Sequence, residues 1–230
     1  MDLNQFVTNL KRPLPVFLLL DSSGSMAGEK VNALNTAVKQ MVADFKGEKL
    51  SEVALQLSII TFGGAAKIVT ELVDINDYQF KAISANGGTP LGAALDLLAT
   101  IINNKEKVTS KGYKPTIVLV SDGQPNDEGW EIKLDSFVSG SRTGKCERWS
   151  LAIGSDADKS MLKRFINNPL DKVVEANGNE ASTKIVDFFK LVTMTTTARA
   201  KSVNPNQSLK IEELKQNIQA EMPKFDFDIE

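Results

Sequence analysis

Two short apolar runs, each followed by an aspartate, constrain the fold more than any other feature of this sequence. Residues 15–20 have the sequence PVFLLL and lead into Asp21, and residues 116–120, TIVLV, lead through Ser121 into Asp122. A continuous apolar run of this length, without polar alternation, is typical of a strand that is buried on both faces of a sheet. Such strands occur in sheets covered by helices on both sides, so the two runs predict an α/β fold.

Helical and strand patterns alternate along most of the chain. Apolar residues at helical spacing predict helices over 29–45, 91–103, 127–138, 159–166 and 182–199. Besides the two apolar runs, strand patterns cover 53–62, 67–73, 149–153 and 172–175. This alternation predicts a doubly wound, mainly parallel central sheet with helices on both faces. The Gly63-Gly64 turn between two of the strand patterns predicts a hairpin, and therefore one antiparallel edge strand.

The chain of 230 residues is long enough for one domain with its own core, and we place that domain at residues 1–201. The composition changes after Lys201, where Asn204-Pro205-Asn206 interrupts the helical pattern. Residues 202–230 are expected to form a C-terminal tail with a short amphipathic helix that begins after Ser208 and stops at Pro223. Two alternatives stay open for this tail: it packs on the domain or on a partner, or it is partly disordered.

Several classes of function are excluded by what the sequence lacks. The chain has no histidine, so a Ser-His-Asp triad, a Cys–His nucleophile and a histidine-containing metal site are all ruled out. A formal net charge of −2 gives no electrostatic case for nucleic acid binding, and the apolar run at 16–20 is too short to cross a membrane. The single cysteine, Cys146, permits no intrachain disulfide, and the N-terminal residues do not resemble a signal segment. We therefore expect a protein of the reducing cytoplasm.

Oxygen-bearing side chains follow the two apolar runs at the point where each predicted strand ends. In an open parallel sheet, ligands bind at the carboxyl ends of the strands, so Asp21 and Asp122 should lie on the same rim. Ser23 and Ser25 follow Asp21 in the connecting loop, and Thr89, in NGGTPLG, occupies the position of an N-cap before the next helix. These five residues form our candidate metal site.

The donor set of this site consists of carboxylate and hydroxyl oxygens without nitrogen or sulfur. Such a set suits Mg²⁺, with Mn²⁺ or Ca²⁺ as alternatives, rather than zinc. Magnesium favours six oxygen ligands and holds its waters tightly, so it tolerates a mixture of protein and water ligands. Five protein oxygens, some of them acting through water, leave at least one coordination position open.

The order DxSxS, then T, then D resembles the metal-ion-dependent adhesion site of von Willebrand factor A domains. The local sequences LLLDSSGSM, GGTPLGAAL and IVLVSDGQPND are also similar to those of such domains, and the resemblance covers about residues 13–200. It implies a Rossmann-like fold in which Ser23, Ser25 and Thr89 give hydroxyl oxygens to the metal. It also implies that Asp21 and Asp122 bind directly or through water, and that a carboxylate from a partner protein often completes the coordination shell.

Within that family the chain resembles the TerY-type proteins of bacterial tellurium-resistance operons, on the basis of its N-terminal lead LNQFVTNLKRPLPVFLLLDSSGSM and its nearly bare domain. This resemblance implies a non-catalytic, metal-dependent protein–protein interaction module in a cytoplasmic complex linked to tellurite resistance or stress. It implies partners such as an operon-encoded kinase, phosphatase or ATPase. We assign Gly88, Gln124 and Asp127 to the rim that meets the partner, while residues 125–127 are equally suited to a turn-and-cap role.

Two other functions are considered beside this one. A strand-end aspartate next to Mg²⁺ is the arrangement of a phosphohydrolase that uses Asp21 as its nucleophile. However, Ser23 stands where the haloacid-dehalogenase pattern has a second aspartate as general acid. The third function is a subunit that docks on a separate ATPase, because the chain has no GxxxxGK[ST] sequence of its own.

Overall fold

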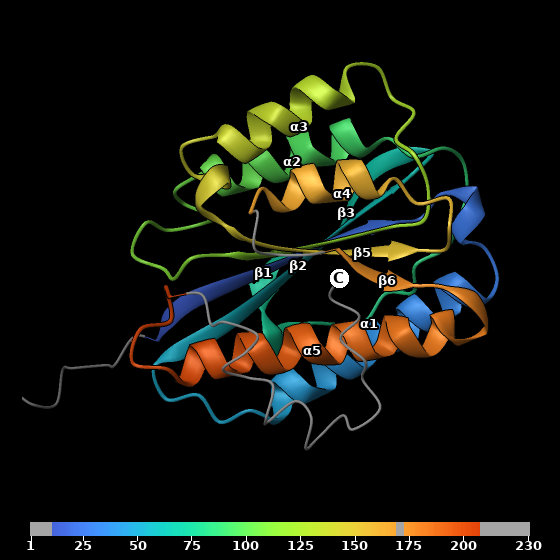
Figure 1. The fold of residues 1–230 in the computed structure, drawn as a ribbon. Helices are drawn as coiled ribbons and strands as arrows, with labels where there is room; N and C mark the ends of the chain where they lie inside the picture. Colours follow the sequence, from blue (N-terminus) through green and yellow to red (C-terminus); the bar gives the residue numbers. More distant parts are fainter. Residues whose placement is uncertain (1–10, 169–172, 208–230) are drawn as a thin grey trace, which may run out of the picture.

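A central sheet with strand order β3-β2-β1-β4-β5-β6 organises the protein (Figure 1). The computed structural model describes residues 11–168 and 173–207, and this sheet is the six-stranded sheet of those residues. Its strands are β1 (Arg12–Asp21), β2 (Val53–Gly63), β3 (Ala65–Asp74), β4 (Thr116–Ser121), β5 (Glu147–Ile153) and β6 (Val174–Ala176). All neighbours pair in parallel except β2 and β3, which form an antiparallel hairpin at one edge. The predicted mainly parallel sheet with one antiparallel edge strand is confirmed.

Helices cover both faces of the sheet, as Figure 1 shows. On one face lie α1 (Glu29–Gly47) and α5 (Ala181–Lys201), which pack against each other. On the other lie α2 (Leu91–Asn103), α3 (Trp130–Ser139) and α4 (Lys159–Ile166). This arrangement confirms the doubly wound α/β fold.

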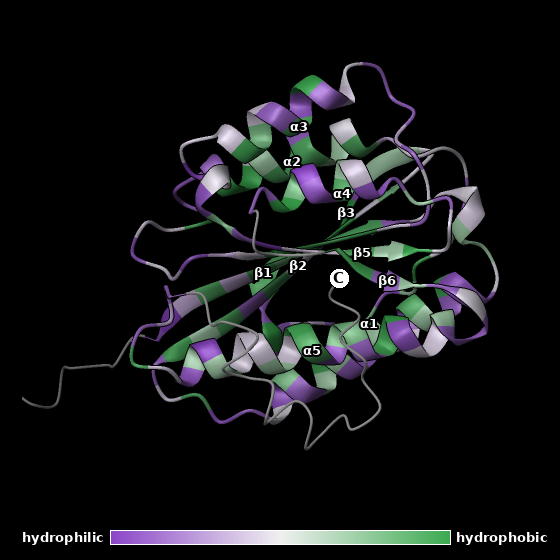
Figure 2. Cartoon of the chain, in the orientation of Figure 1, coloured by the Kyte–Doolittle hydropathy of each residue, from purple (hydrophilic) through white to green (hydrophobic). Residues whose placement is uncertain are grey.

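Two hydrophobic cores sit on opposite faces of the sheet, and alternation along β1 divides its side chains between them. Leu18 and Leu20 belong to the core under α1 and α5, whereas Phe17 and Leu19 belong to the core under α2, α3 and α4. Figure 2 shows the strands as mostly hydrophobic and the helices as mixed. Both faces of β1 are therefore buried, which explains why its sequence is apolar without alternation.

The predicted start of α3 and the predicted N-cap residue of α2 were both wrong. The helix expected over 127–138 begins at Trp130, because Gly129 adopts a left-handed conformation with φ of 70° and Asp127 is engaged elsewhere. Thr89 does not cap α2: the residue in the N-cap position is Pro90, and it supplies no side-chain cap. The predicted strand at 172–175 appears as β6, Val174–Ala176, and Lys172 lies outside the described residues.

The C-terminal end of α5 is fixed to the sheet by a buried arginine. Arg199 is fully buried; it donates to Thr116 Oγ1 at 2.8 Å and to the carbonyl oxygen of Pro205 at 2.9 Å. It also pairs with Glu147 at 3.0 Å. The tail helix predicted after Ser208 lies outside the described residues, so the domain boundary at residue 201 stays a prediction. No helix within 11–168 and 173–207 is long and apolar enough to span a membrane.

Candidate metal centre

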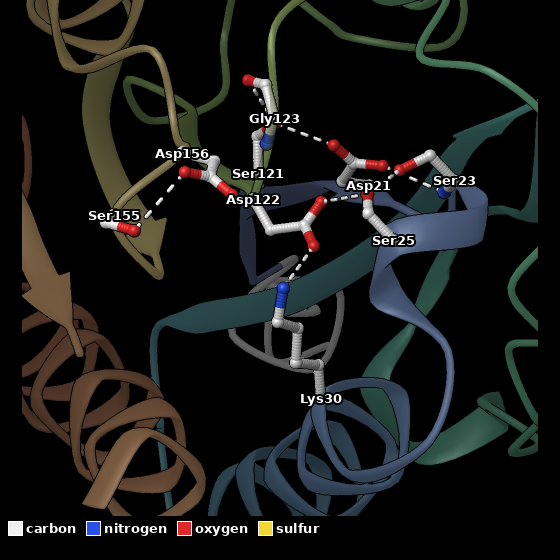
Figure 3. Close-up of polar contacts among 9 residues, drawn as sticks. All are labelled: Asp21, Ser23, Ser25, Lys30, Ser121, Asp122, Gly123, Ser155 and Asp156. Carbon is white, nitrogen blue, oxygen red and sulfur yellow. Dashed lines mark hydrogen bonds and ion pairs between the residues drawn. The ribbon is translucent and has the colours of Figure 1, made fainter. Parts of the chain in front are cut away.

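The strand register brings Asp21 next to Ser121 at the carboxyl end of the sheet. Leu20 pairs with Val120, so the residue after each lies level with the other on the same face. Asp21 is fully buried: its Oδ2 accepts a hydrogen bond from Ser121 Oγ at 2.6 Å, and its Oδ1 accepts one from the backbone N–H of Ser23 at 2.8 Å (Figure 3). Both oxygens of this carboxylate are therefore oriented by the protein.

A chain of oxygen atoms connects the first loop with Asp122. The hydroxyl oxygens of Ser23 and Ser25 lie 3.0 Å apart, and Ser25 Oγ donates to Asp122 Oδ1 at 2.7 Å (Figure 3). Asp21, Ser23 and Asp122 are buried, whereas Ser25 is exposed. The structure thus brings together four of the five predicted ligands, and the group opens to solvent at Ser25.

The fifth predicted ligand, Thr89, lies on a loop that is hydrogen-bonded to both neighbouring loops. The N–H of Gly24 donates to the carbonyl of Gly87 at 2.9 Å, and the N–H of Gly64 donates to that of Gly88 at 2.8 Å. The Thr89 hydroxyl lies close to the residue after Asp122, since a Cβ built on Gly123 would be 4.0 Å from Thr89 Oγ1. Thr89 therefore lies two residues before α2, with its hydroxyl facing the loop that follows Asp122.

Two side chains from the loop after β4 fix the Thr89 segment. Asn126 Oδ1 accepts from the N–H of Thr89 at 2.9 Å. The two carboxylate oxygens of Asp127 accept from the N–H groups of Gly92 and Ala93, at 3.1 and 2.9 Å. Asp127 thereby caps α2 from another loop, where its negative charge also complements the helix dipole.

The three residues assigned to the partner rim differ in their surroundings. Gln124 is exposed. Gly88 is packed beneath Asn126, because a Cβ at this position would lie 2.5 Å from Asn126 Nδ2. Asp127 occupies the capping role that the sequence analysis kept as an alternative, and the contribution of all three to a partner interface stays a prediction.

The two carboxylates have different electrostatic environments. Burial is the main cause that raises the pKa of Asp21, and the neighbouring Asp122 adds to the rise, while hydrogen bonds from Ser121 and Ser23 lower it in part. Asp122 has a cationic neighbour: Lys30 Nζ lies 2.6 Å from its Oδ2, and the Asp122 side chain is fully buried (Figure 3). Two acidic groups buried this close are costly unless a cation compensates their charge.

These residues fit a hard divalent cation. The centre offers two buried carboxylates and a set of hydroxyls, which are ligands of the kind that Mg²⁺ and Mn²⁺ prefer. Within the described part of the chain, no three His, Cys, Asp or Glu side chains gather as a metal cluster.

Three contacts of this centre were not predicted from the sequence: those that Ser121, Lys30 and Asn126 make with Asp21, Asp122 and Thr89. Ser121 ends a strand whose odd-numbered residues, Ile117 and Leu119, share one face with Asp21, so strand alternation with the correct register would have indicated it. Lys30 and Asn126 reach their partners across 92 and 37 positions of sequence, and no local pattern indicates such contacts.

Comparisons with known proteins identify the family of this chain and support its fold. The family model described as the von Willebrand factor type A domain matches residues 16–219. The inter-alpha-trypsin inhibitor heavy chain H2 of Sus scrofa is 28% identical in an alignment over 189 residues, and the match covers 78% of this chain and 20% of that protein. This chain therefore spans about a fifth of the length of the curated relatives it matches.

Two solved structures with metals in their descriptions have the same fold. Proximal thread matrix protein 1 from the mussel byssus, described with a zinc-occupied MIDAS motif, aligns with a TM-score of 0.60 at 17% identity, over 80% of this chain and 46% of its own. The manganese-loaded TRAP protein of Plasmodium vivax aligns with a TM-score of 0.53 at 17% identity, over 77% of this chain and 74% of its own. At this level of identity the two structures show a shared fold only. With the family model covering most of the sequence, the chain belongs to the von Willebrand factor type A domain family.

Proposed function

We propose that this protein is a non-catalytic interaction module in which a divalent metal, held at the candidate centre, forms one contact with a carboxylate of a partner protein. The observation that carries the proposal is the hydrogen-bonded series Ser23–Ser25–Asp122, in which the exposed hydroxyl of Ser25 connects two buried residues. The metal would be held by Asp21, Ser23, Ser25, Thr89 and Asp122. Because the group opens to solvent at Ser25, an outside ligand can approach it.

The chemistry of the donors supports an outside carboxylate as that ligand. Hydroxyl oxygens are neutral, so they bind a cation without cancelling its charge. A cation that keeps part of its charge attracts an anionic group of a partner. We assign Gly88, Gln124 and Asp127 to the rim that would meet the partner.

Magnesium is the metal we propose first, with Mn²⁺ or Ca²⁺ as alternatives. Carboxylate and hydroxyl oxygens are hard ligands, and the chain has no histidine with which to favour zinc. The zinc-occupied MIDAS motif of one solved structure and the manganese loading of the other support a divalent cation as the ligand.

For the cellular context we propose a bacterial cytoplasmic complex linked to tellurite resistance or stress response. This rests on the resemblance of the N-terminal lead LNQFVTNLKRPLPVFLLLDSSGSM and of the nearly bare domain to TerY-type proteins. The partner would be an operon-encoded kinase, phosphatase or ATPase. Docking on an ATPase differs from the other two cases only in the identity of the partner.

The geometry does not favour a phosphohydrolase. A nucleophilic Asp21 would have to be reached by a phosphate group of the substrate, yet its side chain is fully buried. The nearest side chain in the general-acid position is the hydroxyl of Ser23, whose proton is far less acidic than that of a carboxylic acid.

Metal titration tests the first half of the proposal. EDTA-stripped protein should bind Mn²⁺ at one saturable site, and Ser25→Ala should weaken this binding by about tenfold or more, as losses in a metal-ligand network commonly do. Ser155→Ala is the matched control, because Ser155 is an exposed serine on the same rim that contacts only Asp156 in Figure 3. Equal Mn²⁺ binding by the wild type and the Ser25→Ala protein would refute the assignment of the ligands.

A further inference from the structure

A lysine reaches into the candidate centre, although no ligand pattern requires it. Lys30 Nζ lies 2.6 Å from Asp122 Oδ2, with the lysine side chain 35% exposed and the aspartate side chain 0% exposed (Figure 3). Lys30 is in the first turn of α1, where the helix dipole disfavours a positive charge. Its ammonium also lies near the end of β5, since a Cβ built on Gly154 would be 4.0 Å from Lys30 Nζ. The position of this cation is therefore explained by Asp122 and not by its own helix.

The carboxylate of Asp122 divides its oxygens between two functions. Oδ1 accepts from the hydroxyl of Ser25, whereas Oδ2 accepts from Lys30. Lys30 therefore does not contact Oδ1, the oxygen that faces the metal-binding hydroxyl of Ser25. A cation at the hydroxyls and the ammonium can act on the same carboxylate together.

We propose that Lys30 sets the charge of the metal-loaded centre so that it keeps its attraction for a carboxylate; this inference rests on the proposed function. Asp21 and Asp122 together carry the charge needed to cancel that of a divalent cation. Lys30 compensates Asp122, so a net positive charge remains at the loaded centre. Lys30 is therefore a specificity-determining residue: it weakens the binding of the metal itself and strengthens the binding of an anionic ligand to that metal.

The full burial of the Asp122 carboxylate distinguishes this pair from the exposed ion pairs of the chain. Lys159 and Glu175 are also 2.6 Å apart, but their side chains are 48% and 38% exposed, so solvent screens them. The charge of Lys30 acts on a fully buried carboxylate in a less polar environment, where charges interact more strongly.

The test uses Mn²⁺ and acetate as probes, with the EDTA-stripped full chain. Mn²⁺ affinity is measured by calorimetric titration for the wild type, Lys30→Met, Lys30→Gln and Lys30→Arg. Acetate binding to the Mn²⁺-loaded proteins is then followed by the water-proton relaxation of Mn²⁺, with free Mn²⁺ as reference. Lys159→Met is the matched control for loss of a lysine from an ion pair of the same length.

Removal of the charge should increase Mn²⁺ affinity by about three- to tenfold at low salt, and by less at high salt. Acetate affinity should fall by about threefold or more in Lys30→Met and Lys30→Gln, while Lys30→Arg and Lys159→Met stay near the wild type. Because Lys30→Gln keeps a donor for Asp122 without the charge, it separates charge from hydrogen bonding and also serves if the Met variant does not fold.

Unchanged or weaker Mn²⁺ binding in the uncharged variants would overturn the inference about Lys30, and so would unchanged acetate affinity. A wild-type protein that binds no Mn²⁺ would instead overturn the proposed metal centre, and this inference with it. The two failures are therefore distinguishable in one experiment.

Discussion

Replacement of Asp127 by alanine should weaken metal binding, although this residue is not among the expected ligands. Its two oxygens accept from Gly92 and Ala93 at the start of α2, just after Thr89. Loss of a capping carboxylate at a helix N-terminus costs about 1–2 kcal/mol of stability, because two N–H groups lose their partner and the helix dipole loses a compensating charge. We expect this loss to be accompanied by a several-fold decrease in Mn²⁺ affinity, since the Thr89 hydroxyl is no longer held in position.

The assay combines urea unfolding with Mn²⁺ titration, and Asp158→Ala is the matched control. Asp158 caps α4 by accepting from the N–H of Met161 at 2.9 Å, so its removal should cost about 1 kcal/mol of stability and leave Mn²⁺ affinity unchanged. Asp127→Ala with wild-type Mn²⁺ affinity would refute the reasoning. An equal loss of affinity in the Asp158 variant would refute it as well, because the effect would then follow stability alone.

Three further predictions concern the rest of the domain. Arg199→Met should lower the free energy of unfolding by about 3–5 kcal/mol in urea titrations, since it removes a buried cation from its acceptors. The control Lys201→Met, which removes an exposed ion pair with Glu48, should lower it by less than about 1 kcal/mol. Equal losses in the two variants would contradict this account. Burial raises the pKa of Cys146 to about 12, so iodoacetamide at mild alkaline pH should label the thiol only after unfolding, and rapid labelling of the native protein would be contrary to this. Burial raises the pKa of Asp21, so in the metal-free protein this group contributes stability at low pH that is lost as the pH rises through its folded pKa. Because Mg²⁺ binds the ionised carboxylate, the gain in melting temperature on adding Mg²⁺ should shrink as the pH is lowered. A gain that stays constant with pH would argue against Asp21 as a ligand.

Much of the fold follows from periodicity that is visible in the sequence. The continuous apolar runs at 15–20 and 116–120 predict buried parallel strands because both faces of β1 and β4 are covered by helices. Once two neighbouring parallel strands are predicted, their carboxyl ends must meet at one edge, which brings Asp21 and Asp122 together. The fold and the location of the candidate centre were predictable for this reason.

What could not be predicted depends on contacts between distant parts of the chain. The residues PND after β4 have the composition of a helix start, yet Asn126 and Asp127 serve the loop of Thr89 and α2, so α3 begins later than expected. Lys30 and Arg199 find their acceptors 92 and 83 positions away. A local pattern fixes which element a residue belongs to, but it does not indicate which distant partner the side chain meets.

The burial of Asp21 also changes how the centre should be probed. The sequence indicates a carboxylate at the rim, whereas the structure shows it fully buried with both oxygens bonded, so its replacement perturbs folding as well as metal binding. Ser25 is exposed and belongs to the same oxygen series. Ser25→Ala is therefore the cleaner variant for separating interaction from stability.

The most direct test of the central claim is affinity capture from a lysate of the source cells, with Mg²⁺ and again with EDTA. The bait is the wild type, Ser25→Ala or the control Ser155→Ala. A metal-dependent interaction module predicts a protein that is retained by the wild type and by Ser155→Ala only when Mg²⁺ is present, and that is lost with Ser25→Ala. An identical set of captured proteins for all baits, with and without metal, would contradict the claim that this centre binds a partner.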